Sequence, residues 1–527
     1  MIYHCEDHTC NYWDEGEKLP ECCPQCGRKL LRANEADMTG DDWTALGNTL
    51  WYAEASDKKR MVDCFRKAAY LGSAWGVCNL GICMEQGNGV EADPVQAFWL
   101  YQQAVEMGSL NAVCCLGVCY EYGIGTAPDA EKAAELYCKA AEYGSPRGQM
   151  LLARAFHDGI GVEADAAEAV HWVRAAAYQR YGEGMHRLGV CYEYGDGVEQ
   201  NWEHAVHWFR EAAESGVSVA MTDLGYCYEK GRGVEQSWEQ AFSWYRRSAE
   251  CGNPVSMSNL GLCYQMGYGV EQNWQEAIKW YEQGAQCGNL QSMHNLACCY
   301  EHGEGVEQNM TEAIRWYTAA AEGGNADDMY ELGWQYDHGE GVEQDMKKAI
   351  CWYERAAEQN HPAAMNSLGE CYAMGRGVPR DLETAMEWYR RAAELGEAMA
   401  DYNMGWHLEQ AGKLSEAYAH YRKAADGNDD SAWWALGRFY ENGVVVAQDG
   451  KEARRCYETG EKLGSVKCKM RLARCKLLGI GGRREKKAGL DLCRQALELA
   501  KESSEKEDYG YEAEMNLLRR TIAENES

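Results

Sequence analysis

The chain has 527 residues, a formal net charge of −31 and 46% hydrophobic residues. So acidic a surface repels phosphate backbones, which argues against nucleic acid as a partner. No run of about 18 apolar residues occurs, so the sequence predicts no membrane span. Residues 1–6 form neither a basic start nor an apolar run, and we therefore expect a cytoplasmic protein whose 25 cysteines stay reduced.

The first 35 residues carry two closely spaced pairs of cysteines, Cys5 with Cys10 and Cys23 with Cys26. Two turns that each supply two thiolates can gather four ligands for a tetrahedral metal in a segment too short for its own core. The run Cys-Pro-Gln-Cys-Gly at Cys23 resembles a zinc ribbon or rubredoxin-like knuckle. The resemblance implies a small domain over residues 1–35 that holds structural zinc, in preference to iron. A disordered, reduced tail is the alternative.

From residue 36 onward one unit returns every 36 residues, marked by Gly-x-Gly-Val, for example at Gly87, Gly267 and Gly303. Apolar positions at helical spacing predict two helices in each unit. The first helix ends at the first glycine of the marker, where a left-handed backbone favours glycine. The second helix begins after an N-cap residue. The predicted N-caps are Asp93, Asp129, Asp165, Asn201, Ser237, Asn273, Asn309, Asp345 and Asp381.

Two further positions recur in the first helix. The residue after its leucine is small throughout, from Gly81 to Ala473. Since a mid-helix Gly costs about 1 kcal/mol relative to Ala, we expect a close approach of the second helix, with alanine pairs such as Ala140 and Ala141 as the facing surface. Cysteine recurs three residues after the leucine, and we expect small buried core residues there. These are Cys83, Cys119, Cys191, Cys227, Cys263, Cys299, Cys371 and Cys475.

The whole pattern resembles the Sel1-like repeat, a relative of the tetratricopeptide repeat. The resemblance implies an all-α, right-handed α/α superhelical solenoid over residues 36–502, with about 12–13 helix pairs. It also implies a bacterial scaffold or adaptor that binds proteins and has no catalysis of its own. Residues 503–527 are expected to form a charged linker and a C-terminal capping helix.

By the same resemblance, the residues two before, two after and five after the leucine line the concave groove. The last of these positions is acidic in eight units, at Glu85, Glu121, Glu193, Glu229, Glu301, Asp337, Glu409 and Glu441. The other two become aromatic toward the C-terminal half, at Tyr226, Tyr330, Trp334, Tyr402, Trp406 and Trp434. Rings beside carboxylates predict a surface for a protein or peptide with basic and apolar anchors. Rings that only fill the space between curved repeats are the alternative.

Two other functions stay open at this point. Some relatives are suggested to be hydrolases of the lactam or peptidoglycan type, but we find no nucleophile–base pair that departs from the repeat. A zinc ribbon could instead tether nucleic acid, yet residues 1–30 hold only Lys18, Arg28 and Lys29 against six acidic residues. We therefore predict a non-catalytic protein–protein interaction scaffold with no nucleic-acid or membrane partner.

Overall fold

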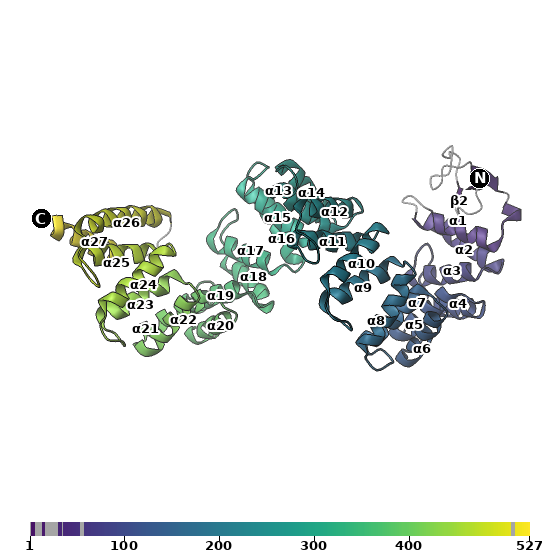
Figure 1. Cartoon of the computed structure of the whole chain (residues 1–527), viewed down its shortest axis with the longest axis horizontal. Helices are drawn as coiled ribbons and strands as arrows, with labels where there is room; N and C mark the ends of the chain where they lie inside the picture. Colours follow the sequence, from purple (N-terminus) through teal and green to yellow (C-terminus); the bar gives the residue numbers. More distant parts are fainter. Residues whose placement is uncertain are drawn as a thin grey trace. The chain divides into compact units, whose positions relative to one another are not determined.

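The computed structural model describes residues 2–5, 13–15, 30–33, 35–52, 57–506 and 512–526. Within these residues it holds three short strands, one 3-10 turn and 27 α-helices (Figure 1). The strands β1 (Ile2–Cys5), β2 (Trp13–Glu15) and β3 (Leu30–Ala33) form one antiparallel sheet in the order β2-β1-β3, and the turn spans Glu35–Asp37. None of the helices in the described part of the chain is long and apolar enough to cross a membrane.

The chain divides into two compact units, Met1–Gly284 and Ala285–Ser527. The first unit contains the sheet and the helices α1 (Gly40–Tyr52), α2 (Lys58–Tyr70), α3 (Ala74–Gln86), α4 (Pro94–Glu106), α5 (Leu110–Tyr122), α6 (Ala130–Glu142), α7 (Pro146–Asp158), α8 (Ala166–Tyr178), α9 (Gly182–Tyr194), α10 (Trp202–Glu214), α11 (Ser218–Lys230), α12 (Trp238–Glu250) and α13 (Pro254–Met266). The boundary between the units falls within α14 (Trp274–Gln286).

The second unit continues the same pattern of helices. Its helices are α15 (Leu290–His302), α16 (Met310–Glu322), α17 (Ala326–His338), α18 (Met346–Glu358), α19 (Pro362–Met374), α20 (Leu382–Glu394), α21 (Ala398–Gln410), α22 (Leu414–Asp426), α23 (Asp430–Asn442), α24 (Gly450–Lys462), α25 (Val466–Leu478), α26 (Lys486–Lys506) and α27 (Glu512–Glu526). Because α26 continues to Lys506, the first residues of the expected linker are helical.

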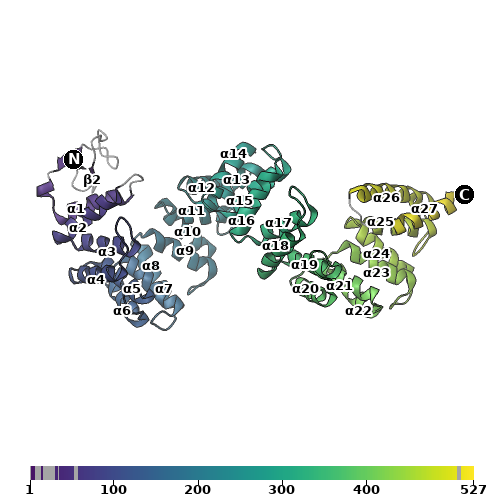
Figure 2. The same ribbon diagram turned by 180° about the vertical axis from the view of Figure 1, so that it is seen from behind.

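Each unit is a stack of helix pairs. An odd-numbered helix, called the first helix below, packs against the even-numbered second helix that follows it, as α5 does against α6. The second helix then packs against the next pair, as α6 does against α7, and both views show these neighbours side by side (Figure 1 and Figure 2). The buried apolar residues form a series of clusters along each stack, and each cluster draws on a few successive helices.

The sequence specifies the ends of these helices, as predicted. In the pair α15–α16, Gly303 ends the first helix in the left-handed conformation at φ 73°, and its N–H bonds to the carbonyl of Cys299. Asn309 caps the second helix, since its side chain accepts a hydrogen bond of 3.2 Å from the Glu312 N–H. The other predicted N-caps accept equivalent bonds.

The small residue after the leucine has a different partner from the one we expected. It faces a tyrosine ring of the second helix, because a Cβ built on Gly81 would lie 2.7 Å from the ring of Tyr101. The alanines of the second helix instead face the start of the next first helix, where a Cβ on Gly148 would lie 2.5 Å from Ala140 Cβ. The cysteines three residues after the leucine are all buried, which confirms them as core residues.

Candidate functional site

A buried tyrosine of the second helix closes the space between successive helix pairs in most repeats. Tyr137 on α6 has no exposed surface, and its hydroxyl donates a hydrogen bond of 2.6 Å to Glu121 on α5. Arg154 on α7 donates to the same carboxylate oxygen at 2.5 Å and so ties the next helix pair to this one. The equivalent buried tyrosines of the other repeats are Tyr101, Tyr245, Tyr281, Tyr317, Tyr353, Tyr389, Tyr421 and Tyr457.

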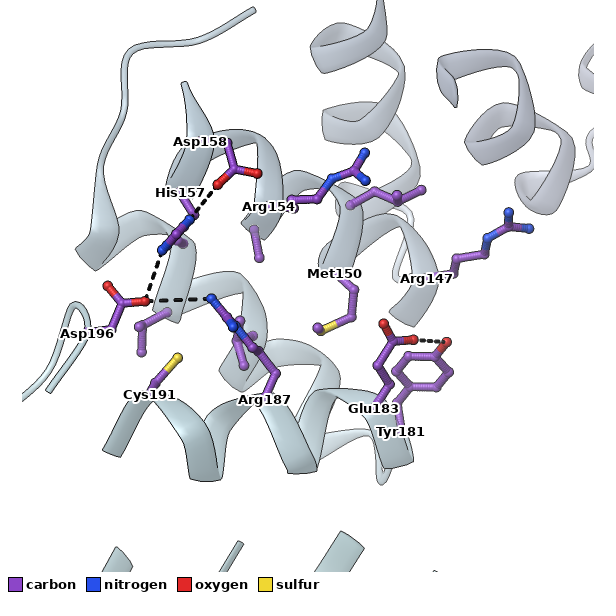
Figure 3. Close-up of a pocket in the computed structure, with 15 residues that line it drawn as sticks. Arg147, Met150, Arg154, His157, Asp158, Tyr181, Glu183, Arg187, Cys191 and Asp196 are labelled. Atoms are coloured by element: carbon purple, nitrogen blue, oxygen red, sulfur yellow. Dashed lines mark hydrogen bonds and ion pairs between the residues drawn. The ribbon is translucent and has the colours of Figure 1, made fainter. Parts of the chain in front are cut away.

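The pair α7–α8 departs from this arrangement. Val173 stands where the tyrosine would be, Ala153 replaces the glycine that faces the ring, and His157 replaces the acid that accepts the tyrosine hydroxyl. Valine is too small to fill the space of a phenol ring. A pocket of about 530 Å³ therefore opens between α7, α8 and α9 (Figure 3).

The inner wall of the pocket is apolar. Ala153, Val170 and Val173 line it and are each at most 3% exposed. Met150 points into the middle of the pocket, and Cys191 reaches it from α9 (Figure 3). Burial raises the pKa of the Cys191 thiol to about 11, so this side chain stays neutral and acts as another apolar contact.

The mouth of the pocket is polar, and its charges are mostly paired. His157 lies 2.6 Å from Asp158 through Nδ1 and 3.2 Å from Asp196 through Nε2. Arg187 lies 3.6 Å from the same Asp196, as the dashed lines at one end of the pocket show (Figure 3). At the other end, the Tyr181 hydroxyl donates to Glu183 at 3.1 Å. An apolar wall beneath a rim of hydrogen-bonding groups can bind an apolar or aromatic side chain that ends in a polar group.

Comparison with known proteins places these repeats in a family. A family model of the Sel1 repeat matches twelve successive stretches, residues 76–109, 112–145, 146–181, 182–217, 218–253, 254–289, 290–325, 326–361, 362–397, 398–429, 432–465 and 466–501. The chain belongs to the Sel1-repeat family. No curated protein sequence matches the chain significantly.

Two solved Sel1-repeat structures are similar to this one. A protective antigen of uropathogenic Escherichia coli strains, described as displaying an SLR fold, is 29% identical with a TM-score of 0.58; the match covers 81% of this chain and 94% of the antigen. A Sel1 repeat protein from Oxalobacter formigenes is 29% identical with a TM-score of 0.41, and the match covers 46% of this chain and 96% of that protein. The family model and the similarity to the antigen show an all-helical solenoid of Sel1 repeats, an architecture that typically serves as a protein-interaction scaffold.

The acidic positions predicted to line a groove of the Sel1 repeats already have partners. Glu301, Glu409 and Glu441 accept hydrogen bonds of 2.6, 2.7 and 2.8 Å from Tyr317, Tyr421 and Tyr457. Asp337 lies 3.5 Å from the Tyr353 hydroxyl and 2.9 Å from Arg376. Arg438 pairs with Glu409 at 2.7 Å, and Arg474 with Glu441. These carboxylates therefore contribute to the packing of the repeats whether or not a partner binds there.

The predicted aromatic residues lie on first helices, and most contact neighbouring side chains. Tyr330 stacks on His361 with ring centroids 5.0 Å apart, and Trp334 stacks on His338 at 4.4 Å. Tyr402 lies 5.6 Å from Tyr421, and Arg438 lies 4.5 Å above the ring of Trp434. Arg232 covers Tyr226 at 5.4 Å in the first unit. Trp406 is the most exposed of the six, at 42%.

The side chains of the four predicted zinc ligands lie outside the part of the chain that the structure describes. Cys10, Cys23 and Cys26 are not among the described residues, and of Cys5 only the backbone at the end of β1 is described. In the remainder of the chain that the structure describes, no group of three or more histidine, cysteine or acidic side chains is placed to hold a metal ion.

The pocket at Val173 was not predicted from the sequence, although a signal for it exists. Aligning the second helices at the spacing of the Sel1 repeat puts Val173 in a column of tyrosines and phenylalanines. The same alignment puts His157 in a column that is mostly acidic. Two departures that fall together in one repeat would have indicated the site.

Proposed function

We propose that this Sel1-repeat protein is a scaffold that binds a protein partner, and that the pocket at Val173 receives an aromatic or aliphatic side chain of that partner. The single observation that supports this is the vacated tyrosine position, which leaves an apolar-walled pocket of about 530 Å³ between α7, α8 and α9. A large side chain that enters a preformed apolar pocket commonly dominates the energy of a protein interface.

The predicted groove residues remain part of this proposal. Trp406 presents an exposed ring, and the other aromatic residues lie on the same type of helix face. Because the acidic row is engaged by tyrosines and arginines, we give apolar anchors more weight than basic ones. A right-handed superhelix with this face on its concave side remains the arrangement that the resemblance implies.

Peptide selection tests the proposal and needs no identified partner. Peptides displayed as a random library would be selected on the full-length protein and then tested against the Val173→Tyr variant. This substitution is suited to the fold, because Tyr317 packs in one core cluster with Ala297 in another repeat of this chain. We expect the selected peptides to share an aromatic or large aliphatic residue and to lose binding to the variant. Peptides that bind both proteins equally would contradict the pocket as the docking site.

The metal site is a separate proposal that rests on the sequence. We propose that Cys5, Cys10, Cys23 and Cys26 hold one structural zinc ion in a cytoplasmic, reducing compartment. Every described cysteine side chain is a free thiol, which accords with that compartment. Elemental analysis of the purified protein should find zinc, and the pair of substitutions Cys23→Ser and Cys26→Ser should remove it. Iron in its place, or no metal, would contradict the proposal.

A further inference from the structure

A buried carboxylate interrupts the repeat in the second unit. Four residues before the leucine of the first helix, the other repeats from α3 to α25 have Gly, Ala, Ser or Cys, because this position faces the preceding helix closely. On α17 the position holds Asp328, whose side chain has no exposed surface. A carboxylate buried in this way is costly unless a cation or hydrogen-bond donors compensate it.

The compensating group is a histidine of the preceding first helix. His294 on α15 contacts Asp328 through Nδ1, which lies 2.7 Å from Oδ1. The other carboxylate oxygen, Oδ2, has no hydrogen-bond partner in the described part of the chain. The aspartate therefore fixes the orientation of the imidazole ring and directs the second nitrogen, Nε2, away from itself.

A thiol lies at the other side of this ring. Cys298 is one helical turn after His294 on α15, and its Sγ lies 3.6 Å from Nε2. Both side chains are partly exposed, and both occupy positions predicted to face a binding groove. A thiol, an imidazole and a buried carboxylate in this order form the arrangement that activates a cysteine nucleophile: the base holds the proton of the thiol, and the carboxylate orients and stabilises the protonated ring.

We propose that Cys298 is a nucleophilic thiol and a site of covalent modification, which takes up an acyl group from an uncharged thioester. His294 holds the proton, and the Cys298 sulfur attacks the carbonyl carbon of the donor. The new S–C bond forms as the C–S bond of the donor breaks, and the leaving thiolate takes the proton from Nε2. One thioester replaces another, so no oxidant, metal or further reagent is needed. This modification is independent of the pocket at Val173, which belongs to the first unit.

The charges around the thiol decide which donors it accepts. On α15, Glu301 and His302 lie close by, and His302 Nδ1 is 3.0 Å from the Cys298 carbonyl oxygen. On α16, the Tyr317 oxygen lies 3.3 Å from Sγ while its proton goes to Glu301. On α17, Asp328 and Glu331 interact with His294 and with Asp327, and Asp327 also lies 3.2 Å from His361. Because carboxylates outnumber cations here, anionic reagents are repelled and uncharged ones are favoured.

The pKa values of the pair support the geometry. The hydrogen bond to Asp328, followed by that to Cys298, raises the pKa of His294 to about 10. Burial raises the pKa of Asp328, while His294 counteracts that rise. The imidazole therefore keeps its proton at neutral pH, and Nε2 directs that proton toward the sulfur 3.6 Å away.

Quantitative alkylation of the full-length protein tests the proposal. Peptide mass spectrometry would follow iodoacetamide labelling of each cysteine, with the exposed Cys287 and Cys351 as internal references. At a pH near 6.5 we expect Cys298 to react about tenfold faster than the references, because the imidazole 3.6 Å from Sγ stabilises the sulfur as it attacks. Iodoacetate, which is anionic, should show a smaller preference for Cys298.

Substitutions of His294 and Asp328 distinguish an activated Cys298 thiol from one that is only exposed. His294→Asn and Asp328→Ser should each reduce the Cys298 rate to that of the references, and serine is the residue that Ser256 and Ser292 provide at the position of Asp328. The matched control is His186→Asn, because His186 pairs with Asp223 at 2.7 Å in a repeat where Val190 replaces the cysteine. A circular dichroism melt would show that each variant folds.

The acyl step has its own readout. Incubation with S-phenyl thioacetate, an uncharged thioester, should add one acetyl group to the Cys298 peptide, and none to that peptide in Cys298→Ser. A Cys298 that reacts no faster than Cys351, that is unaffected by both substitutions, or that gains no acetyl group would overturn the proposal.

Discussion

A comparison of equivalent residues in different repeats shows which positions are filled for packing and which are left open for binding. The tyrosine and the acid of one repeat form a closed pair, as Tyr245 and Glu229 do at 2.8 Å. Phe209 fills the same space with no hydroxyl to donate. Val173 leaves the space empty. The tyrosine position is therefore filled and hydrogen-bonded at Tyr245, filled without a hydrogen bond at Phe209, and unfilled at Val173.

The tyrosine hydroxyl should have a measurable effect on stability. Tyr245→Phe removes the donor to Glu229, and we expect the free energy of unfolding to fall by about 1 kcal/mol, the net value of a hydrogen bond of this kind. The reverse substitution, Phe209→Tyr, brings a hydroxyl toward Glu193 and should raise it. Urea titrations followed by circular dichroism measure both changes. Equal stability of all three proteins would show that the pair contributes nothing.

The N-cap of α23 makes stability depend on pH. Burial raises the pKa of Asp429 to about 6, although its carboxylate accepts a bond of 2.6 Å from the Ala432 N–H. In the unfolded chain the pKa of an aspartate is about 3.9. Between these values the unfolded state releases a proton that the folded state retains, so stability falls as pH rises from about 4 to about 6.

Asp429→Asn isolates this group, because asparagine caps a helix as well as aspartate does. We expect the variant to lose the pH-dependent fall, which is on the order of 1 kcal/mol for a partly exposed carboxyl. Urea midpoints measured across this pH range would show it. A variant whose midpoint follows the wild-type curve would rule out Asp429 as the titrating group.

At the scale of elements, the helix pair α7–α8 lacks the large buried ring that most other repeats have at the position of Val173. Filling the pocket should therefore stabilise the first unit. Val173→Tyr restores the side chain found in most repeats, and cavity-filling substitutions commonly add about 1 kcal/mol. A rise in the melting temperature of the variant, measured by differential scanning calorimetry, is the expected result. A fall would mean that the ring does not enter the pocket.

The elements were predicted well because local signals define them. The glycine at the end of each first helix and the Asp, Asn or Ser before each second helix are fixed by backbone geometry, so the sequence reveals them directly. The partner of Gly81 was not predicted, because alanine and tyrosine both lie on the facing helix and only packing decides between them. The pair of His294 and Asp328 joins residues from successive repeats, which no local pattern shows.

At the scale of the whole molecule, charge and repetition act together. A chain with a net charge of −31 repels itself, and stacked repeats spread that charge over a large surface. Added salt should screen the repulsion, since the Debye length falls from about 10 Å at 0.1 M to about 3 Å at 1 M. We therefore expect the melting temperature to rise with sodium chloride concentration. A fall would indicate that the ion pairs between repeats outweigh the repulsion.

The central claim is that the vacated tyrosine position between α7, α8 and α9 is where a partner docks. A titration of one selected peptide into the wild-type protein, Val173→Tyr and Phe209→Tyr, followed by calorimetry, tests it most directly. We predict that Val173→Tyr weakens binding by about tenfold or more, a loss of at least about 1.4 kcal/mol, whereas Phe209→Tyr leaves the Kd unchanged. Equal Kd values for the wild-type protein and Val173→Tyr would contradict the claim.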